Sequence, residues 1–171
     1  MQNSTSKVRV LTGTAMLGAV AAVLMYLEFP IPIMPAFVKL DVSELPALIA
    51  SFAYGPVSGI LVCLIKNLIK LPSTSTAAVG ELFNFVMGAL FVGVAGLIYK
   101  RNKTRKGAIV GALLGALVMA VVSVPYNYFI VYPAYVVMYH LPLDAIIGMY
   151  QAINPNVNGL LACLLVFNLP F

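Results

Sequence analysis

Charged residues, histidine and cysteine are all scarce in this sequence. Only 9% of the 171 residues are charged, one is histidine, two are cysteine and none is tryptophan. A single histidine leaves almost no material for a histidine-rich metal site or for a Ser-His-Asp arrangement. The chain also lacks a GxxxxGK[ST] stretch, so it does not bind ATP through a P-loop. We therefore expect no catalytic residues, no metal site and no cofactor.

Apolar residues dominate instead. Hydrophobic residues make up 62% of the chain and the mean hydropathy is +1.02, whereas a soluble domain has roughly 25% charged residues. The apolar segments recur along the whole length, which predicts an all-α integral membrane protein with a single membrane domain, residues 1–171. A helix needs about 20 residues to cross the hydrocarbon core. The six predicted transmembrane helices are residues 10–29, 45–54, 57–71, 82–99, 107–130 and 157–171.

Three of these spans are short. Spans two and three meet at Gly55-Pro56, a pair that ends one helix and begins the next, so we expect a tight helix-turn-helix. Short helices commonly border the substrate site of transporters. Span six ends with the sequence at Phe171, and we expect that it is truncated there.

Basic residues gather in two hydrophilic segments, one at the N-terminus and one at residues 100–106. Positive charge marks cytoplasmic loops, so both segments are expected inside the cell. The loop after span one and the segments 71–81 and 140–156 then lie outside. The basic residues of the two segments are Lys7, Arg9, Lys100, Arg101, Lys103, Arg105 and Lys106.

The stretch from Phe29 to Pro46 separates spans one and two. It holds four prolines, which a continuous helix does not tolerate, yet most of its other residues are apolar. Irregular backbone cannot face lipid, so such a loop covers a cavity or lies in the interface. We interpret it as an extracellular lid over a binding site.

Polar side chains at membrane depth are the best evidence for that site, because each is costly there unless it is paired or lines a wet cavity. For Lys66 and Lys70, a helix–helix hydrogen bond or a lysine that reaches the interface is an equally good explanation, whereas Asn127 and Asn168 are harder to explain in this way. Amides offer a donor and an acceptor together, which suits a neutral ligand. The polar residues concerned are Lys66, Asn67, Lys70, Glu81, Asn84, Asn127 and Asn168.

Small residues recur at four-residue spacing in spans one and five. Such spacing lets helix backbones approach closely. For Gly107, Gly111 and Gly115 in span five, packing within the protein is the favoured interpretation. For Ala15 and Ala19 in span one, internal packing and a docking face for a membrane partner are both open.

Residues 37–69 carry a resemblance to a known family. They read FVKLDVSELPALIASFAYGPVSGILVCLIKNLI and resemble the first outer loop and spans two and three of the riboflavin-specific S components of energy-coupling factor (ECF) transporters. GELFNFVMG at 80–88, the Asn127 of YNYF and FNLP at 167–170 match that family further, in the same order. The Lys-x-Asp-x-Ser-x-x-Pro-Ala part of the loop is the most specific.

The resemblance implies a six-helix subunit that captures riboflavin from outside and docks on a transmembrane coupling protein driven by two cytoplasmic ATPases. It matches Ala15 and Ala19 to the family's docking motif in the first helix. It also implies a lysine shortly after Asn168, beyond the last residue of this sequence. The expected ligand contacts are Phe37, Lys39, Leu40 and Asp41 in the lid, Glu81 and Asn84 in span four, Tyr126 and Asn127 in span five, and Asn168 in span six.

Two alternatives stay open. The first is an S component for another vitamin or for a flavin such as FMN. The second is a membrane assembly subunit with no ligand of its own. An intramembrane enzyme ranks third, since no nucleophile and base occur together.

Overall fold

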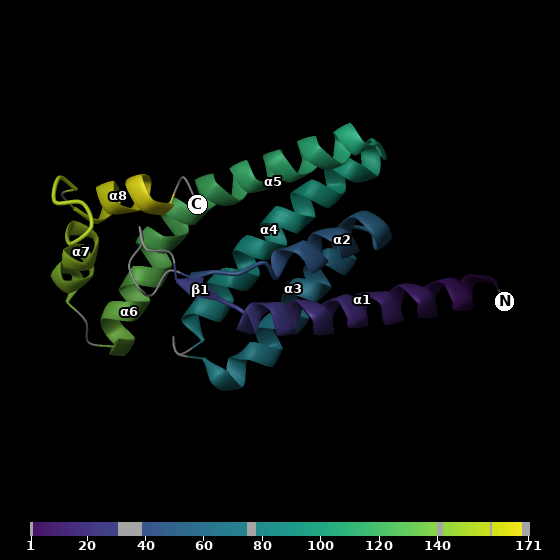
Figure 1. Ribbon diagram of the computed structural model, residues 1–171, viewed down its shortest axis with the longest axis horizontal. Helices are drawn as coiled ribbons and strands as arrows, with labels where there is room; N and C mark the ends of the chain where they lie inside the picture. Colours follow the sequence, from purple (N-terminus) through teal and green to yellow (C-terminus); the bar gives the residue numbers. More distant parts are fainter. Residues whose placement is uncertain (1, 31–38, 75–77, 140–141, 158, 169–171) are drawn as a thin grey trace.

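The computed structural model describes residues 2–30, 39–74, 78–139, 142–157 and 159–168, and these are almost entirely helical (Figure 1). The N-terminus and the turns between α2 and α3 and between α4 and α5 lie toward one end of the bundle, and strand β1 lies toward the other (Figure 1). The α-helices are α1 (Gln2–Tyr26), α2 (Glu44–Tyr54), α3 (Pro56–Lys70), α4 (Val79–Arg101), α5 (Arg105–Tyr126), α6 (Tyr132–Tyr139), α7 (Leu143–Gln151) and α8 (Leu160–Cys163).

Four helical segments within the described residues are long and apolar enough to cross a membrane. They are Ser6–Tyr26, Pro56–Ser73, Val79–Arg101 and Arg105–Met138. The prediction of an all-helical membrane protein is thus confirmed. Spans two and six correspond to shorter elements: α2 has 11 residues, and the short α8 is followed by the π-helical segment η3 (Leu164–Asn168).

The helix predicted at 107–130 is longer than expected. The helical path continues through Pro125 into a π-helical segment, η2 (Asn127–Val131), and on into α6. Proline removes one backbone donor, and a π-bulge is a common way to absorb the disruption. The Asn127 side chain contributes here, since its Nδ2 donates to the carbonyl of Ser123 at 2.9 Å.

The break at Gly55-Pro56 is confirmed. Gly55 has φ of 106°, a conformation that favours glycine, and Pro56 occupies the first position of α3, where its missing N–H is not needed. The lid boundary was wrong at its C-terminal end, because α2 already begins at Glu44. Pro46 fits inside its first turn, where backbone N–H groups lack helical partners anyway.

The glycines of span five pack inside the protein, as predicted. A Cβ on Gly111 would lie 2.8 Å from the backbone oxygen of Ala95, and one on Gly115 would lie 2.6 Å from that of Phe91. Both distances are too short for a real contact, so α4 and α5 approach closely only because these residues are glycine.

The segment 140–156, predicted as an outer loop, contains helix α7. One face of α7 joins an apolar cluster with the final helix and the Val124–Tyr132 region, through Ile146 and Tyr150. Tyr150 is fully buried, and its hydroxyl lies 2.5 Å from that of Tyr132. Burial raises the pKa of Tyr150, so this hydroxyl stays protonated to higher pH than an exposed tyrosine does.

A second apolar cluster forms the centre of the bundle made by α1 to α4. Its buried residues are Ala21, Ala47, Ala50, Val62, Cys63 and Val92. The polar groups described next lie between this cluster and the lid end of the bundle.

Candidate functional site

The two ends of the lid are joined by a short antiparallel pairing of β1 (Phe29–Pro30) with β2 (Lys39–Leu40). Phe29 pairs with Leu40 and Pro30 with Lys39, so the loop leaves and returns to the bundle at one place. Leu40 is exposed, and the neighbouring Asp41 accepts a hydrogen bond from the backbone N–H of Ser43 at 2.7 Å. That bond connects the end of the lid to the start of α2.

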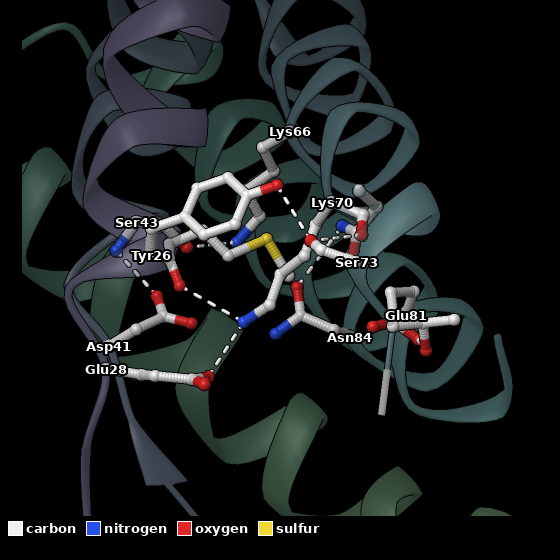
Figure 2. A network of polar contacts seen from close by, with 12 residues as sticks. Tyr26, Glu28, Asp41, Ser43, Lys66, Lys70, Ser73, Glu81 and Asn84 are labelled. Atoms are coloured by element: carbon white, nitrogen blue, oxygen red, sulfur yellow. Dashed lines mark hydrogen bonds and ion pairs between the residues drawn. The ribbon is translucent and has the colours of Figure 1, made fainter. Parts of the chain in front are cut away.

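A buried ion pair links α3 to the start of α2, next to this hydrogen bond. Lys66 is completely buried, and its Nζ lies 2.5 Å from Glu44 Oε1 and donates to Ser43 Oγ at 2.6 Å. Cys63 Sγ lies 3.5 Å from the second oxygen of Glu44. The Lys66 ammonium therefore has protein partners and is not left to bind a ligand (Figure 2).

Lys70, one turn further along α3, makes a second ion pair. Its Nζ lies 2.7 Å from Glu28 Oε2 and donates to the backbone oxygen of Met25 at 3.1 Å, so it connects α3 to the end of α1 (Figure 2). The Tyr26 hydroxyl lies 2.8 Å from Ser73 Oγ and strengthens the same junction. Both lysines of span three thus belong to hydrogen-bonded helix junctions, one of the interpretations that their position allowed.

The first turns of α4 carry Glu81 and Asn84, which share a face because they are three residues apart. Glu81 is buried, and its carboxylate accepts from Thr74 Oγ1 at 2.7 Å. Asn84 is half-buried, and its Oδ1 accepts from Asn67 Nδ2 of α3 at 3.2 Å. Figure 2 shows Glu81 and Asn84 on the same side of the network as Ser73.

Tyr126 and Asn127 lie next to this part of α4. The rings of Tyr126 and Phe83 have centroids 5.6 Å apart, which brings the end of α5 to the start of α4. Asn127 is buried, and one N–H of its side-chain amide donates to the backbone carbonyl of Ser123. Within the described residues its amide oxygen has no hydrogen-bond partner, so the amide can still accept from a ligand.

The structure thus places Glu81 and Asn84 on one face of the start of α4 and brings Tyr126 beside Phe83 of the same helix, with Asn127 next along the chain. Leu40 ends β2 and Asp41 follows it. Phe37 lies outside the described residues. Lys39 belongs to β2 and Asn168 to η3, but their side chains are outside the described part of the chain.

The two alanines of span one face outward. Ala15 and Ala19 are exposed, whereas Gly18 and Ala22 are buried. A Cβ on Gly18 would lie 2.9 Å from Ile65 of α3. Internal packing of α1 therefore uses Gly18 and Ala22 and leaves Ala15 and Ala19 uncovered by this chain.

Sequence analysis did not identify the pairing of Glu44 with Lys66 or of Glu28 with Lys70. A signal was present, because a lysine inside an apolar helix needs a counter-charge and the chain has only five acidic residues. The hydrogen bond between Asn67 and Asn84 had no sequence signal beyond the presence of both amides in neighbouring spans.

Fold and site together define a multi-pass helical membrane protein whose polar side chains gather at one end of the bundle, beside the loop after its first helix. The chain belongs to the ECF transporter, substrate-specific component family, whose match covers residues 9–171. This confirms the resemblance seen in the sequence. It also places the chain among transporter components and not among enzymes.

Individual relatives agree with this assignment. The chain is 39% identical over 127 residues to riboflavin transporter RibU of Staphylococcus aureus (strain TCH60), covering 74% of this chain and 67% of that protein. It is 38% identical over 139 residues to riboflavin transporter FmnP of Bacillus subtilis (strain 168), covering 80% of this chain and 73% of that protein.

A solved structure is similar over nearly the whole chain. It is described as "Structure and mechanism of the S component of a bacterial ECF transporter". The TM-score is 0.71 at 34% sequence identity, and the match covers 99% of this chain and 86% of the other.

Proposed function

We propose that this protein is the riboflavin-binding subunit of an ECF transporter and captures riboflavin from outside the cell. The observation that carries the proposal is the placement of Glu81, Asn84, Tyr126 and Asn127 around the start of α4, in a chain 38–39% identical to two riboflavin transporters. Among the described residues, the amide oxygen of Asn127 has no hydrogen-bond partner, so it can accept from a ligand there.

The chemistry of riboflavin suits these groups. Its isoalloxazine ring is flat and largely apolar, so Leu40, Phe37 and the ring of Tyr126 supply walls. Amides and carboxylates satisfy its ring carbonyls, its ring N–H and the ribityl hydroxyls. High affinity follows from burying most of the ligand in a largely preformed site closed by the lid. Lys39, Asp41 and Asn168 complete the proposed ligand contacts.

The proposed topology has six membrane spans, with α2 and the α8–η3 segment crossing as short helices. The N-terminus and the basic segment 100–106 face the cytoplasm, because positive charge is retained there. The lid and the proposed site then face outward. Figure 1 is consistent with this arrangement, since the N-terminus and the α4–α5 turn lie away from β1.

The binding test is direct. The detergent-purified protein is examined for a flavin absorption band and then titrated with riboflavin, with quenching of flavin fluorescence as the readout. We expect saturable quenching with a Kd at or below the low micromolar range, typical of a site that buries most of its ligand. FMN and unrelated vitamins are titrated in parallel, and tighter binding of one of them would reassign the substrate.

A folded protein that binds none of these ligands would contradict the proposal and favour the assembly-subunit alternative. The same titration is repeated on a chain extended beyond Phe171. Binding by the extended chain would show that a ligand contact lies after Asn168, and continued absence of binding would favour the assembly-subunit alternative.

The proposed partner is a transmembrane coupling protein driven by two ATPases, with Ala15 and Ala19 as the docking face. Their exposure supports this proposal, because small uncovered residues let another helix approach closely. ATP hydrolysis in the partner subunits would supply the energy that moves the lid and releases the ligand.

Changing both Ala15 and Ala19 to leucine should abolish co-purification with the coupling protein and leave the riboflavin Kd within about twofold, because no site residue is touched. Ala116→Leu is the matched control, since Ala116 is an exposed small residue on α5. Undiminished co-purification of the double variant would exclude this face from docking. Loss of riboflavin binding would show that α1 shapes the site instead.

A further inference from the structure

Asn67 is a buried amide of α3 that is not among the proposed ligand contacts. Its side chain is only 5% exposed. Its Nδ2 donates to the backbone oxygen of Cys63 at 2.8 Å and to Asn84 Oδ1 at 3.2 Å. One amide nitrogen thus connects a helix backbone to a proposed ligand contact.

The first of these bonds fixes the orientation of the Asn67 amide. The carbonyl of Cys63 can only accept, so the Asn67 atom facing it must be the nitrogen. The second hydrogen on that nitrogen is then directed to Asn84, whose facing atom must be its oxygen.

This arrangement determines which end of Asn84 remains available. With Oδ1 held by Asn67, the NH₂ group of Asn84 points in another direction within the amide plane, and it has no partner among the described residues. Figure 2 shows the nitrogen of Asn84 turned away from the dashed contact made by its oxygen. Asn84 is only half-buried, so part of its side chain remains accessible.

The Oδ1 end of Asn67 is buried and contributes no hydrogen bond to the fold within the described residues. A buried acceptor without a partner destabilises the fold, and a leucine here would avoid that cost. Features that reduce stability are expected at functional sites.

We propose that Asn67 is a positioning residue, which holds Asn84 so that its N–H groups point into the site and select a ligand acceptor such as a ring carbonyl. The inference rests on the proposed function, because it takes Asn84 to be a ligand contact. It adds a direction to that contact: Asn84 donates and does not accept.

The test compares Asn67→Leu, Asn84→Leu and the double variant in riboflavin titrations of the full chain. Each is also titrated with a riboflavin analogue in which sulfur, a weak acceptor, replaces a ring carbonyl oxygen. The 2-thio and 4-thio analogues are used in turn. Thermal melts in detergent are recorded without ligand.

For Asn67→Leu we expect riboflavin binding to weaken by roughly 5- to 10-fold, the effect of losing one hydrogen bond, while the melting temperature stays equal or rises. The preference for riboflavin over one thio analogue should shrink by a similar factor. Adding the Asn67 change to Asn84→Leu should have no further effect on Kd, because the two residues act as one unit. Asn67→Ala replaces Asn67→Leu if leucine does not fit.

Three outcomes would overturn the inference while the wild-type protein binds riboflavin normally. The first is an unchanged riboflavin Kd in Asn67→Leu, and the second is additive effects on Kd in the double variant. The third is weaker binding in Asn67→Leu together with a lower melting temperature and an unchanged preference for riboflavin over the thio analogues. A wild-type protein that binds no riboflavin would instead overturn the proposed function and this inference with it.

Discussion

Lys66→Met should lower the stability of the protein by about 3 kcal/mol, the lower end of the range for removing one partner of a buried ion pair. Lys66 is fully buried, but Glu44 keeps 25% of its side chain exposed, which moderates the loss. Methionine fills the space of the lysine stem and leaves the carboxylate of Glu44 and the hydroxyl of Ser43 without their donor. For a chain of this size, the melting temperature should fall by roughly 6–12 °C.

A thiol-reactive dye in a thermal melt gives a local readout of this change when Cys163, the other buried free cysteine, is replaced by alanine in every variant, because the buried Cys63 lies beside Glu44. Lys70→Met is the matched control: its pair with Glu28 is more exposed, at 13% and 29% for the two side chains. It should cost about 1 kcal/mol or less. Combining Lys66→Met with Glu44→Gln should recover part of the loss, since the uncompensated charge disappears. Equal melting temperatures for the two single variants would contradict a structural role for the Lys66 pair.

Asn127→Leu should raise the riboflavin Kd by roughly 30-fold or more. Each ligand group left without a partner costs about 1–3 kcal/mol, and we expect the amide of Asn127 to pair with two of them, through its oxygen and through the N–H that does not donate to Ser123. At about 1.4 kcal/mol per tenfold, two lost partners give that factor. The measurement is the flavin-quenching titration of the purified variant.

Asn156→Leu is the control, because it makes the same change at an exposed amide outside the proposed site. It should leave the Kd unchanged. The melting temperature of Asn127→Leu without ligand must also be recorded, since Asn127 donates to the Ser123 carbonyl near Pro125. A Kd within twofold of the wild type would remove Asn127 from the site.

The two variants separate stability from binding. Lys66 and Glu44 hold α2 against α3 at the point where the lid returns to the bundle, and neither is proposed to touch the ligand. Asn127 lies where α5 passes into its π-helical segment, beside the first turns of α4. A variant that loses stability but keeps its riboflavin affinity therefore identifies a structural residue. A variant that loses affinity but keeps its stability identifies a ligand-binding residue.

Much of the fold could be predicted from the chain because the signals are local. Long apolar runs identify the membrane class whatever their neighbours, and Gly55-Pro56 ends one helix and begins the next through its own backbone preferences. The π-helical continuation past Pro125 was less predictable, because it depends on how the backbone groups around the proline are satisfied in the packed bundle.

The polar residues near the span ends could be recognised from the sequence, but their pairings could not. The sequence alone determined that this is a helical membrane protein with amides and carboxylates at span ends, because hydropathy and the cost of burying polar groups act on each segment separately. Only the tertiary structure decided that Glu44 meets Lys66 and Glu28 meets Lys70, across 22 and 42 residues of chain. It also decided that Ala15 and Ala19 stay uncovered while Gly18 packs inward. Helical periodicity tells which residues share a face, but the neighbour that a face meets is set by how the helices pack.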